Sequence, residues 1–171
     1  SKSAWLNPAG KGVAGSDEIP YWIRAVSRTA YALDDPRLID LSGKWLQAIM
    51  ANQQPDGYLG AAVYRSGWYG KGPLPALYPP QMVLNALEGY YEYTGDQQVL
   101  EVLQKYYQWL LSLPDKKFLG PSNPVDGYFF HADRSVENLS SVYWLYNRTE
   151  EPWLIELGTK IFTNSNPWYL G

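Results

Sequence analysis

Three stretches of the chain repeat apolar residues at helical spacing, and each stretch divides into two helices joined by a short acidic turn. The paired helical segments are 21–33 with 37–51, 81–93 with 97–112, and 137–148 with 153–162. In 97–112 the apolar stripe comprises Val99, Leu103, Tyr106 and Leu110, and in 37–51 it comprises Leu38, Leu41, Trp45, Leu46 and Ile49. An internal repeat of this kind predicts an all-α fold made of helical hairpins.

The residues of the turns and of the paired helices predict where the helices begin and which of them are buried. Asp35-Pro36 and Glu151-Pro152 each combine an acidic residue with proline, which indicates a capping carboxylate followed by the first residue of a helix. The first helix of each pair is apolar around more of its circumference, as Met82-Val83-Leu84 shows. Helices of that kind are buried, so we expect the first helices to form an inner layer.

This arrangement predicts where a ligand would bind. The acidic turns would lie at one end of the array, and the long loops 53–74 and 113–136 at the other, beside the N-termini of the inner helices. Three hairpins make about half of a helical toroid. We therefore expect residues 1–171 to be the N-terminal half of a single, larger helical barrel domain, with the remainder of that barrel as a partner.

Composition removes several classes of function. The net charge is −3, and the 14 Lys and Arg residues are scattered, which argues against a nucleic-acid partner. No apolar run approaches the ~18 residues of a membrane span, and the N-terminus shows no apolar signal segment. With no cysteine and one histidine, we expect neither a metal site nor another cofactor in this chain.

The aromatic residues point to sugars. Eight Trp and fifteen Tyr against four Phe favour rings with a polar atom, which suit a wet apolar cleft as well as a helical core. Glycoside hydrolysis typically uses two carboxyl groups, and Glu137 and Glu18 lie at the predicted mouth in apolar or aromatic surroundings. We take these two as the catalytic candidates, with helix capping as the alternative role for each.

Further residues at the same end could bind the substrate. Tyrosine and tryptophan rings pack on sugars, and amide and carboxylate groups bond their hydroxyls. Asp56 and Asp126 each precede Gly-Tyr, so a shared turn is an alternative for both, and His131 could be an ordinary loop residue. The substrate-binding candidates are Trp22, Gln54, Asp56, Tyr58, Trp68, Tyr69, Tyr78, Gln81, Asp126, His131 and Asp133.

Several segments, in order and spacing, resemble a known family. YWIRAVSRTAYALDDPRLID, QQPDGYLG, YPPQMVLNALEGYYEYTGDQQVLEVLQKYY and ENLSSVYWLYNRTEEPWLIEL are similar to the beta-L-arabinofuranosidase-like proteins of glycoside hydrolase family 127. The resemblance covers roughly residues 17–165. It implies an (α/α)6 barrel, cleavage of arabinofuranoside-like linkages in plant or microbial glycans, and a secreted or periplasmic location.

The chain also departs from the family's pattern. Founding members place a histidine before a Leu-Tyr pair and another after it, whereas Leu77-Tyr78 is preceded by Pro75 and followed by Met82. The resemblance places the family's nucleophilic cysteine and zinc ligands in the second half of the barrel. Two alternatives stay open: a non-catalytic glycan-binding or scaffolding domain, and a terpene cyclase or prenyltransferase toroid.

Overall fold

The computed structural model describes residues 2–7, 11–66, 75, 77–115 and 134–165, and within these ranges the chain is helical with no β-strand. The α-helices are α1 (Glu18–Leu33), α2 (Pro36–Ala51), α3 (Tyr78–Thr94), α4 (Gln98–Ser112), α6 (Asn138–Thr149) and α7 (Trp153–Asn164). Two short 3-10 helices, η1 (Ala62–Ser66) and η4 (Ser135–Glu137), complete the described elements. The predicted all-α class and the three helical hairpins are confirmed.

The turn between α1 and α2 forms as the sequence predicts. Asp34 takes the left-handed conformation (φ 50°) and ends α1. The Asp35 carboxylate accepts hydrogen bonds from the backbone N–H groups of Arg37 (2.9 Å) and Leu38 (3.3 Å). Pro36 is the first residue of α2, where its missing N–H costs nothing.

The predicted cap of the last helix is wrong. Pro152 itself occupies the N-cap position of α7, and the helix begins at Trp153 without a side-chain cap. Glu151 is therefore one residue too early, and only its backbone carbonyl takes part, accepting from the N–H of Leu154 at 3.1 Å. The sequence pattern predicted the position of the turn correctly, but the side chain of Glu151 does not cap the helix.

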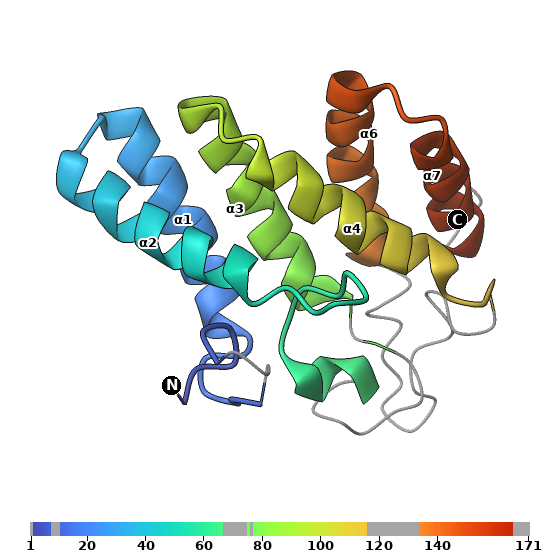
Figure 1. Cartoon of the computed structure of the whole chain (residues 1–171), viewed down its shortest axis with the longest axis horizontal. Helices are drawn as coiled ribbons and strands as arrows, with labels where there is room; N and C mark the ends of the chain where they lie inside the picture. The colour runs from blue at the N-terminus through green and yellow to red at the C-terminus, as the bar shows by residue number, and fades with distance from the viewer. Residues whose placement is uncertain (1, 8–10, 67–74, 76, 116–133, 166–171) are drawn as a thin grey trace.

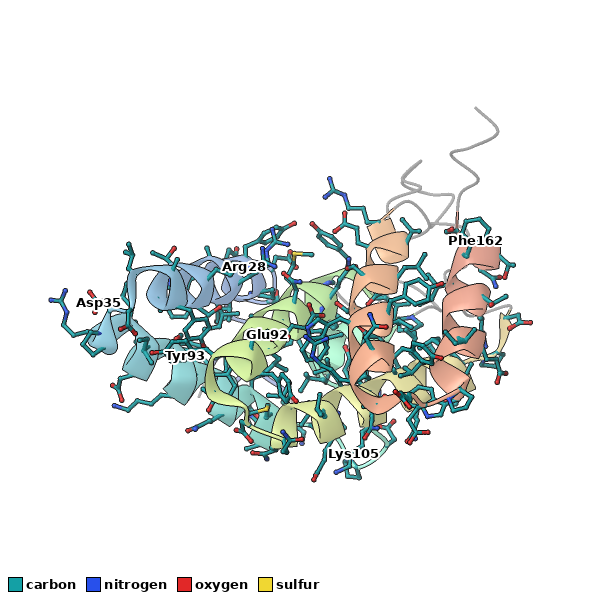
Figure 2. The ribbon with its side chains drawn as sticks, turned by 90° about the horizontal axis from the view of Figure 1, so that it is seen from above. Arg28, Asp35, Glu92, Tyr93, Lys105 and Phe162 are labelled. Atoms are coloured by element: carbon teal, nitrogen blue, oxygen red, sulfur yellow. The ribbon has the colours of Figure 1, made fainter. Side chains whose placement is uncertain are left out.

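The helices form two layers, as expected. Figure 1 shows the three short turns at one end, and the N-termini of α1, α3 and α6 at the opposite end. Seen from above, α1, α3 and α6 stand in a row with α2 and α4 along one side of it and α7 beside α6 (Figure 2). We call α1, α3 and α6 the inner row. Its members pack on one another, since α3 contacts both α1 and α6.

The core lies between the inner row and the outer helices. The predicted stripe of α4 is buried throughout, whereas in α2 the buried residues are Ser42, Leu46, Ile49 and Met50, and Leu41 is 39% exposed. α3 is buried around most of its circumference between Tyr78 and Tyr90, as expected of a central inner helix. Tyr106 and Tyr107 are fully buried beneath it.

A lysine joins the second hairpin to the third. The Lys160 ammonium on α7 donates to the carbonyls of Leu111 (3.0 Å) and Leu113 (2.6 Å) and pairs with Asp115 (3.2 Å). The last carbonyls of a helix lack partners within the helix and carry partial negative charge. Lys160 therefore caps the C-terminus of α4 from a neighbouring helix. No helix among the described residues is long and apolar enough to cross a membrane.

Candidate functional site

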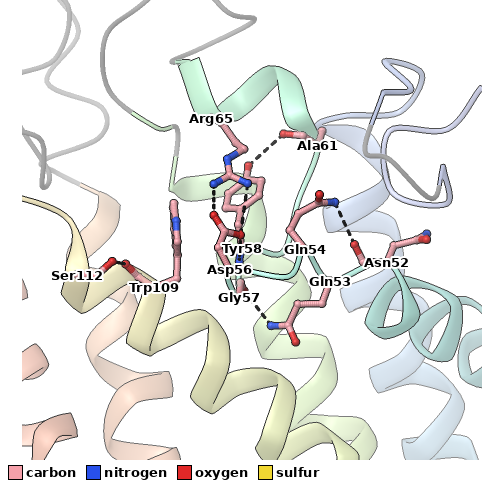
Figure 3. Close-up of polar contacts among 10 residues, drawn as sticks. All are labelled: Asn52, Gln53, Gln54, Asp56, Gly57, Tyr58, Ala61, Arg65, Trp109 and Ser112. Atoms are coloured by element: carbon pink, nitrogen blue, oxygen red, sulfur yellow. Dashed lines mark hydrogen bonds and ion pairs between the residues drawn. The ribbon is translucent and has the colours of Figure 1, made fainter.

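The segment 53–65 forms a turn that is held against α4 (Figure 3). The Gln54 N–H donates to the Tyr58 carbonyl (2.8 Å), and the Gly57 N–H donates to the Gln54 carbonyl (2.9 Å). The Gln53 amide group donates to the carbonyls of Gly57 (2.9 Å) and Val102 (2.8 Å), and the latter belongs to α4. These bonds fix the turn to the outer layer.

Asp56 has a structural role in this turn. Its carboxylate accepts from the Tyr58 N–H (3.2 Å) and pairs with Arg65 of η1. Partial burial disfavours the charged form, but the Arg65 guanidinium and the Tyr58 N–H outweigh it and hold the pKa of Asp56 below its ordinary value. The turn alternative for Asp56 accounts for all of these contacts. The Gln54 amide likewise donates within the turn, to the Asn52 carbonyl at 3.3 Å.

The expected sugar contact of Tyr58 is wrong. Its side chain is fully buried, its hydroxyl donates to the Ala61 carbonyl (3.0 Å), and its ring meets the Trp109 ring edge-on at 4.8 Å. The Arg65 guanidinium lies 4.8 Å from the ring centroid, on the face of the ring. Burial raises the pKa of Tyr58 well above its ordinary value. With no exposed ring face, Tyr58 packs the turn onto α4.

A second set of polar residues lies where the inner-row helices begin. The Gln81 amide N–H donates to Glu137 Oε2 (3.2 Å), while the Gln81 amide oxygen accepts from Asn138 Nδ2 (3.2 Å). Gln81 and Asn138 are buried, and Glu137 is exposed at the end of η4. Both ends of the Gln81 amide are thus used within the protein. Gln81 is fixed by Asn138 and in turn positions the Glu137 carboxylate, in place of the expected bond to a sugar.

Tyr78 belongs to the same region but does not present its ring. It is 4% exposed, its hydroxyl shares a hydrogen bond with the Tyr21 hydroxyl, and Arg134 Nη1 donates to it at 3.1 Å. We correct the expected stacking role, because no face of the ring is open. Tyr21 is 46% exposed and is the open ring at this place. Partial burial and the bond to Tyr78 raise the pKa of Tyr21 to about 12.

Two arginines extend this surface along α1. Arg24 Nη1 donates to the thioether sulfur of Met82 (2.9 Å), and Arg28 Nη2 donates to the Asn85 amide oxygen. Asn85 Nδ2 donates in turn to Glu88 Oε2 (3.0 Å). Burial of the Glu88 carboxyl raises its pKa, against the opposing effects of Ser141, Asn85 and the neighbouring arginines. We call Tyr21, Arg24, Arg28, Tyr78, Gln81, Arg134 and Glu137 the inner-row cluster.

The remaining described candidates lie nearby or elsewhere. Glu18 is exposed in the first turn of α1, at the predicted end of the array. The Trp22 ring is 39% exposed and packs edge-on against Trp45 of α2 at 5.2 Å, on the side of the outer layer. Its sugar contact stays a prediction. Trp68, Tyr69, Asp126, His131 and Asp133 lie outside the described residues.

Sequence reasoning missed four members of the cluster, which are Tyr21, Arg24, Arg28 and Arg134. Each reaches its partner on α3 only through the packing of the fold, across 56 to 58 residues of sequence. The spacing of Tyr21, Arg24 and Arg28 along one side of a helix was the available signal. The neighbouring Trp22 was predicted instead, because its side chain is aromatic.

The described residues do not fit a metal ion. They contain no group of three or more histidine, aspartate or glutamate side chains placed to hold one, and the chain has no cysteine. The chemistry available at the inner-row cluster is therefore that of a carboxylate, arginines, tyrosine hydroxyls and an amide.

Comparison with known proteins gives one clear result. The family described as beta-L-arabinofuranosidase, GH127 catalytic domain, matches residues 7–166. That range includes the whole inner-row cluster and every described helix. No curated protein matches the chain.

Proposed function

This chain belongs to the beta-L-arabinofuranosidase GH127 catalytic-domain family of glycoside hydrolases, and we propose that it acts on arabinofuranoside-like linkages of plant or microbial glycans. The family match over residues 7–166 is the observation that carries this proposal. The cleft would lie at the N-terminal ends of α1, α3 and α6. Support for that place comes from the exposed Tyr21 ring, which is bonded to Tyr78 at the start of α3, and from the hydrogen bonds of Gln81 to Glu137 and of Arg134 to Tyr78.

Glu137 is the carboxylate that we assign to the hydrolysis. Glycoside hydrolysis needs one carboxyl group to protonate the leaving oxygen and a second to act as nucleophile or base. The amide of Gln81 holds one oxygen of Glu137 at 3.2 Å, which leaves the other oxygen for a substrate. A catalytic group works best when a neighbouring side chain fixes its geometry. Glu18, exposed at the start of α1, is our candidate for the second carboxylate.

The barrel itself needs more chain than the described helices. We propose that residues 1–171 form the N-terminal half of one (α/α)6 catalytic domain, and that the remainder of the protein closes the toroid around the inner-row cluster. An oligosaccharide or polysaccharide would then be bound between the two halves. We also place the protein outside the cytoplasm, secreted or periplasmic, because polymeric glycans do not cross a membrane.

Variant kinetics on the intact protein test the proposal. Glu137→Gln keeps the side-chain volume and removes the acid, so we expect kcat on an aryl L-arabinofuranoside to fall by about 10²-fold or more. Glu18→Gln should also lower kcat if it supplies the second carboxylate. Glu101→Gln is the matched control, because Glu101 is also exposed but lies on the outer helix α4.

Far-UV circular dichroism of each variant separates lost chemistry from lost fold. The proposal fails if Glu137→Gln retains wild-type turnover. Sugar binding without turnover by the wild-type protein would favour a non-catalytic glycan-binding domain.

A further inference from the structure

Two arginines of α1 have neutral partners only, within the described part of the chain. Arg24 donates to the Met82 sulfur and Arg28 donates to the Asn85 amide oxygen, and neither makes an ion pair with a described carboxylate. Three other described arginines differ, because carboxylates pair with Arg37, Arg65 and Arg148. The inner-row cluster is therefore locally cationic in a chain whose net charge is −3.

The partners of these arginines leave most of their bonding capacity unused. A guanidinium offers five N–H donors, and the described residues use one on each arginine. A thioether sulfur is a weak acceptor, so Met82 is a poor partner for a charged group. Arg24 and Arg28 are also separated by one helical turn, where like charges repel each other.

The buried acid Glu88 makes no ion pair with either arginine in the described structure. Glu88 interacts with the charge of Arg28, but the Asn85 amide stands between the two in the hydrogen-bonded chain. Glu88 is 9% exposed, whereas Arg28 is exposed. An anion arriving from solvent would therefore meet Arg28 without competition from the Glu88 carboxylate.

We infer that this surface binds a glycan bearing a carboxylate, such as a uronic acid residue, with Arg24 and Arg28 holding the carboxylate and Tyr21 packing on the adjoining sugar. The planar guanidinium matches a carboxylate with two parallel hydrogen bonds. Tyr21 is 46% exposed and one helical turn from Arg24, which suits a sugar ring beside the anion. The inference rests on the proposed function, since it names the substrate class of the same cleft.

Paired oligosaccharide probes test it on the intact protein. We would measure Kd by isothermal titration calorimetry for an oligogalacturonide with free carboxylates and for its methyl-esterified form of equal length. We expect the free acid to bind at least about tenfold more tightly, because bonds between charged groups are the strong ones. Arg24→Gln and Arg28→Gln should each remove most of that preference, and Arg28→Lys should keep part of it.

Arg37→Gln is the matched control, since Arg37 is exposed on the outer helix α2 and should leave the preference intact. The inference is overturned if the ester binds as well as the acid, if neither binds, or if the preference survives both glutamine variants. It is also overturned if a sulfated oligosaccharide binds more tightly than the uronate. Hydrolysis of an aryl arabinofuranoside, measured in parallel, separates the two proposals: turnover without a uronate preference overturns only this inference, whereas an arginine-dependent preference without turnover overturns only the proposed activity.

Discussion

Replacing Gly57 with alanine measures how tightly the turn of residues 53–58 is docked on α4. Gly57 has a φ of +97°, and a Cβ built there would lie 2.2 Å from the Lys105 carbonyl oxygen and 2.8 Å from its carbon. An alanine held at such a φ costs about 1–3 kcal/mol. Moving the turn away from α4 would also stretch the bond from Gln53 to the Val102 carbonyl, which contributes about 1 kcal/mol.

We therefore expect Gly57→Ala to lower the free energy of unfolding by about 2–4 kcal/mol, a large part of the 5–15 kcal/mol typical of a domain. Gly95→Ala is the matched control. Gly95 also has a positive φ, +72°, but no atom lies within 4 Å of its added Cβ. That variant should lose about 1–2 kcal/mol, the cost of the left-handed conformation alone.

The assay is urea unfolding of the intact protein followed by far-UV circular dichroism, with the slope of the transition compared among the proteins. The difference between the two variants isolates the close approach to Lys105. If Gly57→Ala is no more destabilising than Gly95→Ala, the turn is not held against α4, and the structural role given to the QQPDGYLG segment is wrong.

Three further substitutions test separate parts of the fold. Asp35→Ala should lower Tm at neutral pH, because the hydrogen bonds from Arg37 hold the pKa of Asp35 below its ordinary value. That stabilisation is present above the unfolded-state pKa and is lost as pH falls through the folded-state pKa. A loss of Tm that persists in acid would contradict the capping role. Burial raises the pKa of Glu88, so its charge destabilises the fold as pH rises past the ordinary glutamate pKa. Glu88→Gln should therefore flatten the fall in Tm as pH rises from that pKa through the folded-state pKa, and an unchanged slope would refute this. The Tyr106 hydroxyl is buried with no hydrogen-bond partner in the described structure. Tyr106→Phe should therefore leave the free energy of unfolding unchanged or raise it by up to about 1 kcal/mol. A clear fall in that free energy, measured by chemical denaturation, would contradict this.

The hairpins could be predicted from sequence because their determinants are local. The apolar spacing of 97–112, the Asp35-Pro36 pair and the acidic turns each act within a few residues of the structure that they specify. The error at Glu151 is of the same local kind, a displacement of one residue at a helix end. Lys160 shows where local reasoning stops, since its carbonyl partners lie 47 and 49 residues away.

The candidate site was harder to predict because it depends on how helices pack against one another. Tyr21 and Trp22 are adjacent in sequence, yet successive residues of a helix point about 100° apart, so Tyr21 meets α3 while Trp22 meets α2. Tyr58 and Tyr78 are of a residue type that often binds sugars, but both are buried, so neither ring has a face exposed to solvent. Glu137 and Gln81 were predicted at the mouth as separate residues, and the structure shows the bond that joins them.

Turnover by the intact wild-type protein on a panel of aryl glycosides that includes L-arabinofuranosides is the most direct test of the proposed activity. We expect release of the aryl group from an arabinofuranoside at a higher kcat/KM than from any pyranoside in the panel, and loss of that release in Glu137→Gln. No turnover of any member by a protein with an intact helical spectrum would contradict the assignment of this chain to arabinofuranoside cleavage.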